Sequence, residues 1–478
     1  MSDQTTIVLV RPFIRDYVNS MSASSFESSI GLVPPLNLCS IAAMLESVGI
    51  DVLIYDCEAP TSSESQFVEY LQRHKPKYVG ISMITTNFHG ALKTARLIRS
   101  TLPDSYIIGG GTHMMIYPEE TFTYDEFNFG IIGEAEQSLA DFILQHQAGD
   151  VDYSSIPGLV YRENGKVIKS AKWALNEDLD VIPFPAYHLL ERDNYRMPNT
   201  GNNVITLYLT RGCPYMCGFC FRNDQLKNVR YKSIDKVIEE ITYMVETFGA
   251  RSINFVDEIM TFKKRYFLEF CEKLSAKNFD LEWQAPTRAN CVDEEIIIAA
   301  KKSGCHTFRF GLESGTEDIM KKNEKHLSLA TSENALRLCR KHGIKTVGYF
   351  IIGYLDETEE TIRATIDFAK RMRPDYAAFF PATPMPETAL YRESIEKGLV
   401  PGDYWRDFVL GKQKEAIPFI FPNAGEWTQR AYREFYFSPV FIFRQLLTWK
   451  FYAEFFQNVN IALKLWNMKF QRLYGVLH

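Results

Sequence analysis

The sequence predicts an α/β protein with three parts: an N-terminal doubly wound parallel sheet of the Rossmann type, a partial TIM-like barrel of six βα units, and a helical C-terminal region. Three observations lead to this prediction. Short apolar runs alternate with helical patterns through the first 145 residues, the alternation restarts at residue 204, and an aromatic helical pattern follows from about residue 401. We therefore expect domains at 1–145 and 201–400, a connector at 146–200 and a separate helical domain at 401–478.

The expected N-terminal strands are continuous apolar runs, which is typical of a parallel sheet covered by helices on both faces. These strands are TIVLVRP (5–11), DVLIYDCE (51–58), YVGISMIT (78–85), SYIIGGGT (105–112) and NFGIIGE (128–134). Helical patterns lie among them at 37–49, 65–74 and 90–102. Sheets of this type bind ligands at the carboxyl ends of their strands, so the residues at those ends become candidate contacts.

The segment from 146 to 200 has the pattern of a connector, with a hairpin predicted around Asn164 and Gly165. From residue 204, strands and helices alternate again. The expected strands lie at 204–210, 252–258, 281–287, 307–313, 345–352 and 376–383, and the expected helices near 233–248, 263–276, 293–303, 328–342 and 359–371. Six such units predict a parallel barrel, in which chemistry takes place at the carboxyl ends of the strands.

The C-terminal part is rich in aromatic residues, and residues 439–478 contain five Lys or Arg against one acidic residue. A helical cap over the barrel is the first interpretation of this segment. A lid over an apolar substrate and a helix that lies on a membrane surface are the alternatives.

Composition excludes several classes of protein. The chain has 478 residues, 46% apolar and 23% charged, so a collagen-like chain and bulk disorder are excluded. A net charge of −6 does not attract nucleic acid, and we expect no nucleic-acid partner. The N-terminus lacks a secretory pattern and no run of 18 apolar residues occurs, so we expect a cytoplasmic protein.

Three of the nine cysteines fall within one short loop, TRGCPYMCGFCFRN (210–223), which directly follows the first barrel strand. Thiolates are the usual ligands of iron–sulfur clusters. Cys213, Cys217 and Cys220 would hold three irons of a 4Fe–4S cube and leave the fourth iron open to an external ligand. A zinc site, which needs a fourth ligand that is not found nearby, and a chance grouping of buried cysteines are the alternatives.

This loop resembles that of the radical S-adenosylmethionine (SAM) superfamily. The resemblance implies that SAM chelates the fourth iron, and that an electron from the cluster cleaves SAM to a 5′-deoxyadenosyl radical, which abstracts hydrogen from the substrate. It also implies SAM contacts from the aromatic residue before the third cysteine and from polar residues at strand ends. These candidates are Phe219, Asp257, Glu258, Arg288, Glu313 and Ser314. Loop packing or a surface ion pair is the alternative role for each.

Four upstream segments resemble the radical SAM enzymes that bind cobalamin: GGGTHMMIYPEE (109–120), GIIGEAEQSL (130–139), IPGLVYRENG (156–165) and LDVIPFPAYHLL (179–190). The resemblance implies that the N-terminal sheet binds cobalamin at its strand ends. The candidate contacts are Arg11, Ser82, Thr85, Thr86, Asn87, Gly109, Gly110, Gly111, His113, Gly133 and Glu134. The glycines could instead form only a tight turn, and Glu134 could instead cap the following helix.

One feature of some cobalamin proteins is missing. They ligate cobalt through a histidine in an Asp-x-His-x-x-Gly motif, which none of the nine histidines here fits. We therefore expect no histidine ligand to cobalt. The resemblance implies instead that Thr85, Thr86 and Asn87 cover the lower face of the cofactor, and a weakly covered cobalt suits methyl transfer.

The resemblance implies an enzyme, and methyl transfer from methylcobalamin to an unactivated carbon or phosphorus of a small or lipid-like substrate is the leading interpretation. A cobalamin-dependent cyclase or oxidative ring-forming enzyme that transfers no methyl group is the alternative. A radical SAM enzyme without cobalamin and a corrinoid or iron–sulfur sensor are further alternatives. We expect an external electron donor of the flavodoxin or ferredoxin type. Peripheral membrane contact would involve the aromatic C-terminal region.

Overall fold

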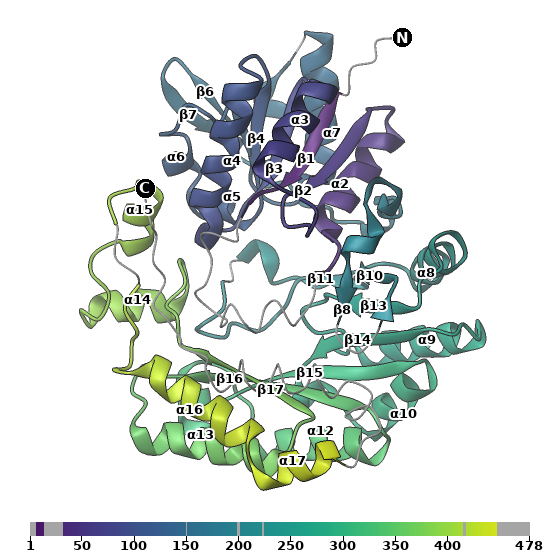
Figure 1. The fold of residues 1–478 in the computed structure, drawn as a ribbon, viewed down its shortest axis with the longest axis vertical. Coiled ribbons are helices and arrows are strands. Elements are labelled where there is room, and N and C mark those ends of the chain that lie inside the picture. Colours follow the sequence, from purple (N-terminus) through teal and green to yellow (C-terminus); the bar gives the residue numbers. More distant parts are fainter. Residues whose placement is uncertain are drawn as a thin grey trace.

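The computed structural model describes residues 6–13, 32–149, 151–197, 201–221, 224–413 and 417–446. Two α/β units make up most of the molecule. The N-terminal unit lies at the top of the view in Figure 1 and the barrel unit lies below it. The α/β class, the Rossmann-like sheet and the partial barrel predicted from the sequence are confirmed.

The N-terminal unit is a seven-stranded sheet with the strand order β2-β1-β3-β4-β5-β6-β7. Its strands are β1 (Ile7–Arg11), β2 (Val52–Asp56), β3 (Tyr78–Ser82), β4 (Tyr106–Gly110), β5 (Phe129–Ile131), β6 (Leu159–Glu163) and β7 (Lys166–Lys169). Its helices are α2 (Leu36–Ser47), α3 (Glu64–His74), η1 (Thr85–Asn87), α4 (Phe88–Thr101), α5 (Thr112–Ile116), α6 (Pro118–Thr121) and α7 (Ala135–Ala148). The strand order reverses between β1 and β3, and doubly wound sheets bind ligands at such a switch point.

The predicted hairpin is present as β6 and β7, and it turns at Asn164 and Gly165, which both have positive φ. However, β6 pairs antiparallel with β5. The hairpin therefore extends the N-terminal sheet and covers the edge that β5 would otherwise expose. The N-terminal sheet thus continues to Lys169, beyond the expected boundary at residue 145.

The barrel unit is a six-stranded parallel sheet with the order β10-β13-β14-β15-β16-β17. Its strands are β10 (Val204–Leu207), β13 (Ser252–Phe255), β14 (Glu282–Thr287), β15 (Cys305–Glu313), β16 (Lys345–Ile352) and β17 (Tyr376–Pro381). Its helices are α8 (Ile234–Phe248), α9 (Lys264–Ala276), α10 (Glu294–Lys302), α11 (Glu317–Lys322), α12 (Leu329–Lys341) and α13 (Glu359–Met372).

Shorter elements join these units. They are η2 (Tyr153–Ser155), η3 (Leu179–Val181), η4 (Tyr187–Leu189), η5 (Arg192–Asn194), β8 (Arg196–Met197), β9 (Gly201–Asn202), β11 (Thr210–Arg211), η6 (Asp224–Leu226), β12 (Arg230–Tyr231) and η7 (Ala289–Cys291). The antiparallel pair β11–β12 matters most for the site, because it brackets the cysteine loop.

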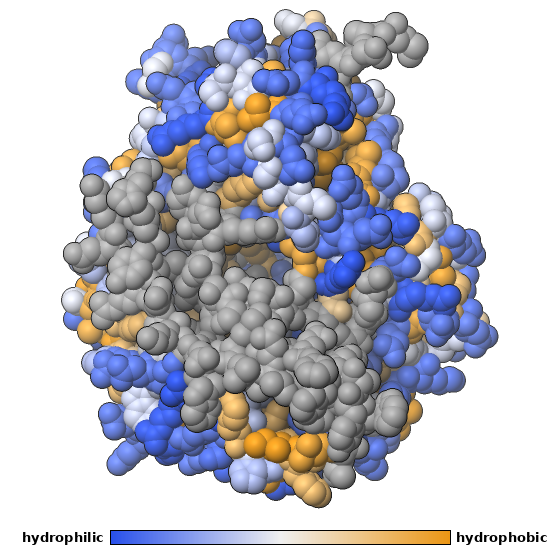
Figure 2. Space-filling model, viewed as in Figure 1, coloured by the Kyte–Doolittle hydropathy of each residue, from blue (hydrophilic) through white to orange (hydrophobic). Residues whose placement is uncertain are grey.

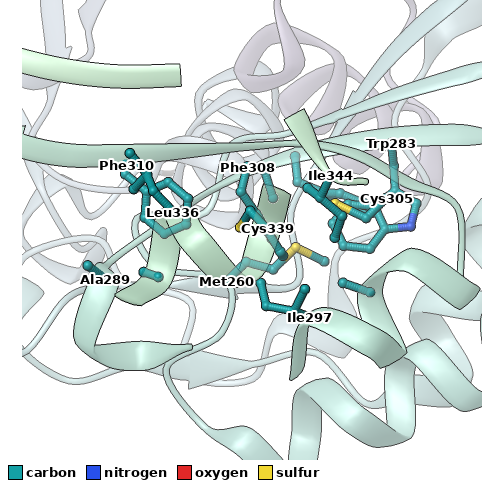
Figure 3. Close-up of a cluster of buried hydrophobic side chains, with 14 of the residues drawn as sticks. Met260, Trp283, Ala289, Ile297, Cys305, Phe308, Phe310, Leu336, Cys339 and Ile344 are labelled. Atoms are coloured by element: carbon teal, nitrogen blue, oxygen red, sulfur yellow. The ribbon is translucent and has the colours of Figure 1, made fainter. Parts of the chain in front are cut away.

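The outer face of the barrel sheet packs on its helices through an apolar core. Trp283, Phe308 and Phe310 are buried in this core with Ile297 of α10 and Cys339 of α12, as Figure 3 shows. Since side chains alternate along a strand, the residues between these apolar positions face the opposite, inner side of the sheet.

The C-terminal part contains α14 (Ala389–Glu396), α15 (Tyr404–Val409), α16 (Ala424–Tyr436) and α17 (Pro439–Leu446). Trp405 of α15 is buried in the core of the N-terminal unit, and Arg406 pairs with Glu120 next to it. In contrast, α16 packs on β17 and α13 of the barrel. Residues 389–413 and 417–436 therefore form a strap that contacts both units, where the sequence predicted a separate domain.

Helix α17 exposes apolar side chains, with Phe443 63% exposed and Val440, Ile442 and Leu446 also exposed. Figure 2 shows orange residues at the lower end of the view, where Figure 1 places α17. Within the described residues, no helix is long and apolar enough to cross a membrane. The aromatic segment expected after Leu446 lies outside the described residues.

We expect Trp405→Ala to lower the free energy of unfolding by about 3–5 kcal/mol, because it removes a fully buried indole. It also removes the bond from Trp405 Nε1 to the Pro384 carbonyl oxygen, which is 2.7 Å long. Urea denaturation of the full chain measures this change. Phe443→Ala, on the exposed α17, is the control and should change the value by no more than about 0.5 kcal/mol. Equal effects of the two substitutions would contradict the packing of the strap.

Candidate functional site

The cysteine loop is held by backbone hydrogen bonds to distant segments. The Cys213 N–H donates to the Leu226 carbonyl oxygen at 3.2 Å, and the Cys220 N–H donates to that of Cys217 at 2.9 Å. Gly218 donates its N–H to Asn323 and accepts from Leu390, both at 2.9 Å. The loop thus has a defined backbone path at the carboxyl end of β10, and none of the nine cysteines forms a disulfide.

A guanidinium lies against this loop. Arg288, which is buried after β14, has Nη1 3.7 Å from Cys217 Sγ, and its guanidinium carbon lies 4.0 Å from the centre of the Tyr215 ring. Its Nε donates to Asn290 Oδ1 at 2.8 Å. A cation at this place would offset part of the negative charge of a thiolate bound to a metal cluster.

The donor set suits a cluster better than a single ion. Among the described residues, no three His, Cys, Asp or Glu side chains are grouped as ligands of one metal ion. In a cubane cluster each thiolate binds a different iron, so the three sulfur atoms need not converge on one point. Cys217 and Cys220 are only half-buried, so an iron–sulfur cluster can reach them.

Glu313 and Phe219 lie together above the barrel sheet. Glu313, at the end of β15, has φ +60° and accepts from Lys325 Nζ at 2.9 Å. The same ammonium lies 5.9 Å from the centre of the Phe219 ring. Ser314 is fully buried, and its hydroxyl lies 3.3 Å from Thr365 Oγ1, so it faces α13 and not this group.

The turn after β16 completes this part of the site. The Tyr354 ring lies 5.8 Å from that of Phe219, and its buried hydroxyl has no hydrogen-bond partner. Glu357 accepts from the N–H groups of Gly353 at 2.6 Å and Tyr354 at 3.0 Å, and burial raises its pKa to about 7. An unpartnered buried hydroxyl beside a cysteine loop is a donor available to a ligand.

Sequence reasoning did not identify Lys325 or Glu357. Lys325 follows a short helix with no recognisable motif, and only the fold brings it to Glu313. Glu357 lies in the polar stretch after β16. A carboxylate that accepts two N–H groups of its own turn leaves no periodic signal in the sequence.

Asp257 and Glu258 bind the backbone of the cysteine-loop strand. The buried Asp257 carboxylate accepts from the N–H groups of Leu209 and Thr210 and from the Thr210 hydroxyl, at 2.7 to 3.0 Å. Burial raises its pKa to about 6 despite these bonds. Glu258 Oε2 accepts from the Gly212 N–H at 3.3 Å. Asp257 therefore positions the loop. Its side chain is oriented towards this backbone, which differs from the SAM contact expected from its place at a strand end.

The N-terminal candidates line the switch-point edge. Arg11 at the end of β1 lies 3.5 Å from Asp56 Oδ2, and Ser82 at the end of β3 accepts from Asn37 Nδ2 at 2.9 Å. Ile84, which follows β3, is 47% exposed although it is apolar. An exposed apolar side chain beside strand ends fits a large, partly apolar ligand.

The turn η1 is supported from below by a buried histidine. Thr121 Oγ1 donates its one hydrogen to the Tyr117 carbonyl oxygen at 2.7 Å, so His113 Nε2 is the donor in its 3.0 Å contact with Thr121. His113 Nδ1 then accepts from the Thr85 hydroxyl at 3.2 Å. The ring stacks on Phe88, and burial lowers its pKa to about 3. His113 and Thr85 thus bond each other inside the core, while Asn87 Oδ1 accepts from the Ile84 N–H at 2.9 Å.

The glycines of this edge differ in their constraints. Gly111 has φ +89°, and a Cβ there would lie 2.4 Å from the Met83 carbonyl oxygen. Gly133 has φ +110°, and its Cβ would lie 2.1 Å from the Ala174 carbonyl oxygen. Both positions require glycine for internal packing. Gly110 has only one atom near its Cβ position, at 3.9 Å, so it leaves an open backbone surface there, whereas Gly109 faces Met83 and Met114.

Glu134 links the two units. Its carboxylate pairs with Arg230 at 2.7 Å and lies 3.4 Å from Arg211 Nη1, while Arg211 Nη2 pairs with Glu136 at 2.6 Å. Asn176 donates its N–H to Glu134 at 2.8 Å. Burial alone raises the pKa of Glu134, but the two arginines and the Asn176 N–H lower it below its usual range. The carboxylate expected to contact cobalamin is therefore committed to the barrel unit.

Comparison with known proteins agrees with this division. Residues 27–143 match the B12 binding domain family and residues 207–369 match the radical SAM superfamily. An uncharacterised methyltransferase of Pyrococcus horikoshii is 30% identical over 86% of this chain and 90% of its own length. An anaerobic magnesium-protoporphyrin IX monomethyl ester cyclase of Rubrivivax gelatinosus is 28% identical over 86% of this chain and 75% of its own length.

A solved structure has the same fold. It is the radical SAM methyltransferase TsrM from Kitasatospora setae with cobalamin and a [4Fe–4S] cluster bound. It superposes with a TM-score of 0.65 at 18% identity, and the match covers 84% of this chain and 76% of that one. At this identity, the match shows that the two units have the same fold.

We expect Glu134→Gln to destabilise the folded chain by about 3 kcal/mol, because it leaves the partly buried Arg230 without an anionic partner and Arg211 with Glu136 alone. Denaturant unfolding measures the change. Glu126→Gln removes the partner of the exposed Arg96 and is the matched control, with an expected cost below about 1 kcal/mol. If the two variants unfold at the same denaturant concentration, the link between the units is not a stabilising one.

The buried His113 gives a pH-dependent prediction. Its pKa is about 3 in the folded chain and near the ordinary 6.5 when unfolded, so the neutral ring contributes stability above pH 6.5. This contribution is lost as pH falls from 6.5 towards 3, by about 1.4 kcal/mol per pH unit. We expect the difference in unfolding free energy between the wild type and His113→Gln to shrink over this range. A difference that is constant from pH 7 to pH 4 would contradict a neutral buried ring.

Proposed function

This chain belongs to the radical SAM enzymes that carry a B12-binding domain, and we propose that it transfers a methyl group to an unactivated carbon or phosphorus of a small or lipid-like substrate. Its cofactors are those of the two families, namely a [4Fe–4S] cluster, SAM and cobalamin. One observation carries the proposal: Glu134 follows β5 and Arg211 follows β10, and the two side chains are in contact. The carboxyl ends of the two sheets therefore face each other.

Each group has residues suited to it. Cys213, Cys217 and Cys220 would hold the cluster, and Arg288 would stabilise the thiolate of Cys217. Phe219, Glu313 and Lys325 would contact SAM, whose charged methionine part suits an ammonium and a carboxylate. Ser82, Ile84, Thr86, Asn87 and Gly110 would lie against cobalamin at the switch-point edge.

When bound, the cluster and SAM supply a radical that abstracts hydrogen from the substrate, and cobalamin supplies the methyl group. The chain's own residues position these groups and limit water around them. Asp257 holds the strand that enters the cysteine loop, and His113 holds the turn η1 through Thr85. Tyr354 and Phe219 cover the cluster end with aromatic surface, which lowers the local dielectric constant.

A cyclase that transfers no methyl group is the second candidate, because the similarity to the Rubrivivax gelatinosus cyclase extends over most of both chains. Both reactions would need the same cofactors at the same sheet edges. The products that are formed from SAM distinguish the methyltransferase from the cyclase.

We further propose the setting in which the enzyme works. A cytoplasmic location would keep the cysteine loop reduced. The cluster would receive its electron from a flavodoxin or ferredoxin. The exposed apolar side of α17, with Phe443 at its centre, would rest on a membrane surface if the substrate is lipid-like.

The test is anaerobic reconstitution with iron, sulfide and cobalamin, followed by desalting, reduction and analysis of SAM products. A methyltransferase retains corrinoid absorbance and converts SAM to both S-adenosylhomocysteine and 5′-deoxyadenosine. A cyclase forms 5′-deoxyadenosine alone, and a chain that retains no corrinoid would refute the proposal. Cys217→Ala should abolish 5′-deoxyadenosine formation, whereas Cys271→Ala, in the outer core of α9, should not.

A further inference from the structure

The inner face of the barrel sheet carries an arginine on its central strand. Phe308, Phe310 and Leu312 of β15 are buried in the outer core against the helices. Because side chains alternate along a strand, Arg309 and Gly311 lie on the inner face. Arg309 is half-buried there, four residues before Glu313, which corresponds to about 13 Å along the strand.

Arg309 has only neutral partners. Its Nη1 donates to Asn254 Oδ1 at 2.6 Å and its Nη2 donates to the Phe255 carbonyl oxygen at 2.7 Å, so it reaches across β14 to β13. No carboxylate of the described residues forms an ion pair with it. Burial lowers the pKa of Arg309, as expected of a cation that has lost water without gaining a counter-ion.

Three other cations of the interior pair with carboxylates, whereas the buried Arg288, like Arg309, has none among the described residues. Arg211 pairs with Glu136 at 2.6 Å, Lys232 with Glu240 at 2.6 Å, and Lys325 with Glu313 at 2.9 Å. A guanidinium has five N–H donors, and the two bonds of Arg309 leave several unused. Among the described residues its Nε has no hydrogen-bond partner, and it is not one of the fully buried atoms that lack a partner, so this donor is accessible.

The surroundings of Arg309 are polar on one side and aromatic on the other. Thr206, Asn254, Gln284 and Thr307 are in register across β10, β13, β14 and β15, and the buried Thr206 hydroxyl has no partner. Towards the carboxyl ends, the rings of Tyr349 and Phe380 lie 6.2 Å apart and both are half-buried.

The Glu313–Lys325 ion pair lies on the inner face between Arg309 and the cluster end. Gly311 is the inner-face position between Arg309 and Glu313, and it has no side chain. A Cβ there would lie 2.3 Å from Glu313 Oε1 and 2.9 Å from Lys325 Nζ. Glycine thus keeps the Glu313–Lys325 pair close to the sheet.

We propose that Arg309 binds an anionic group of the substrate, a carboxylate or a phosphate, while the apolar or aromatic body of the substrate lies along Tyr349 and Phe380 towards the cysteine loop. The planar guanidinium fork matches the paired oxygens of both anions. This inference rests on the proposed function, and it narrows the substrate class to amphiphilic anions.

The first test is chemical footprinting of the reconstituted holoenzyme with phenylglyoxal, which modifies accessible arginines, read by mass spectrometry. The probes are 2-naphthoate, 2-naphthyl phosphate and the neutral 2-naphthamide. At ten times its dissociation constant, an anion that occupies the site should slow modification of Arg309 about tenfold. The neutral amide should not slow it, and the stronger of the two anions identifies carboxylate or phosphate as the preferred group.

A variant then tests the energetic role of the charge. Arg309→Gln should weaken binding of the preferred anion by about 10- to 100-fold, which is the range of a charge-assisted hydrogen-bonded pair. The affinity for 2-naphthamide should stay the same. Arg340→Gln, which removes a guanidinium bonded to the Met372 carbonyl oxygen, is the matched control and should leave anion binding unchanged.

Three results would overturn the inference. The first is that Arg309 is not modified by phenylglyoxal in the ligand-free holoenzyme. The second is that neither anion slows its modification. The third is that Arg309→Gln lowers the affinities for the anion and for the amide equally. If Arg309→Gln does not fold, phenylglyoxal footprinting of the wild type still tests the inference. Corrinoid and cluster absorbance are recorded on the same sample, so that a failure of the proposed function is seen separately from a failure at Arg309.

Discussion

The contact between Arg211 and the carboxylates of Glu134 and Glu136 determines how the two halves of this protein work together. Arg211 lies two residues before the first cysteine of the loop, and both glutamates lie at the start of α7, just after β5. One guanidinium thus ties the strand that enters the cysteine loop to the ligand-binding edge of the N-terminal sheet. Arg230 lies on β12, which pairs with β11, and its ion pair with Glu134 is a second contact between the same two elements.

The close approach of the two units explains why several candidate residues have roles different from those first expected. Charged groups at the meeting edge are costly to bury unless they are paired, so Glu134 is committed to arginines and Asp257 to backbone N–H groups. The residues left for ligands are those with partly accessible or unpartnered atoms. They include the thiols of Cys217 and Cys220, the hydroxyl of Tyr354 and the open backbone at Gly110. The strap that contains Trp405 makes a second contact between the two units, so they are held at two places.

The sequence was sufficient to predict the strands of both sheets, most of the long helices and the cysteine loop, because each of these leaves a local pattern; α7 (Ala135–Ala148) was not among the expected helices. The apolar runs of β1 and β3 and the spacing of Cys213, Cys217 and Cys220 are examples. Contacts between segments distant in the chain left no such pattern. Nothing in the run around Trp405 indicates that it packs on the N-terminal core, and nothing near His113 indicates that Thr85 and Thr121 would occupy both of its nitrogens. Alternation along β15 does place Arg309 on the inner face, but its lack of a carboxylate partner is visible only in the folded chain.

In the arrangement that we propose, cobalamin and the cluster would face each other across the meeting edges of the two sheets. Double electron–electron resonance tests it most directly, on anaerobic enzyme that holds cob(II)alamin and the reduced cluster. Each cofactor then carries an unpaired electron, and neither needs an added label. We expect a resolved dipolar coupling with a single narrow distance distribution, because the ion pairs of Arg211 and the strap at Trp405 hold the units in one arrangement. A sample that contains both cofactors but shows no coupling, or a broad distribution, would contradict it.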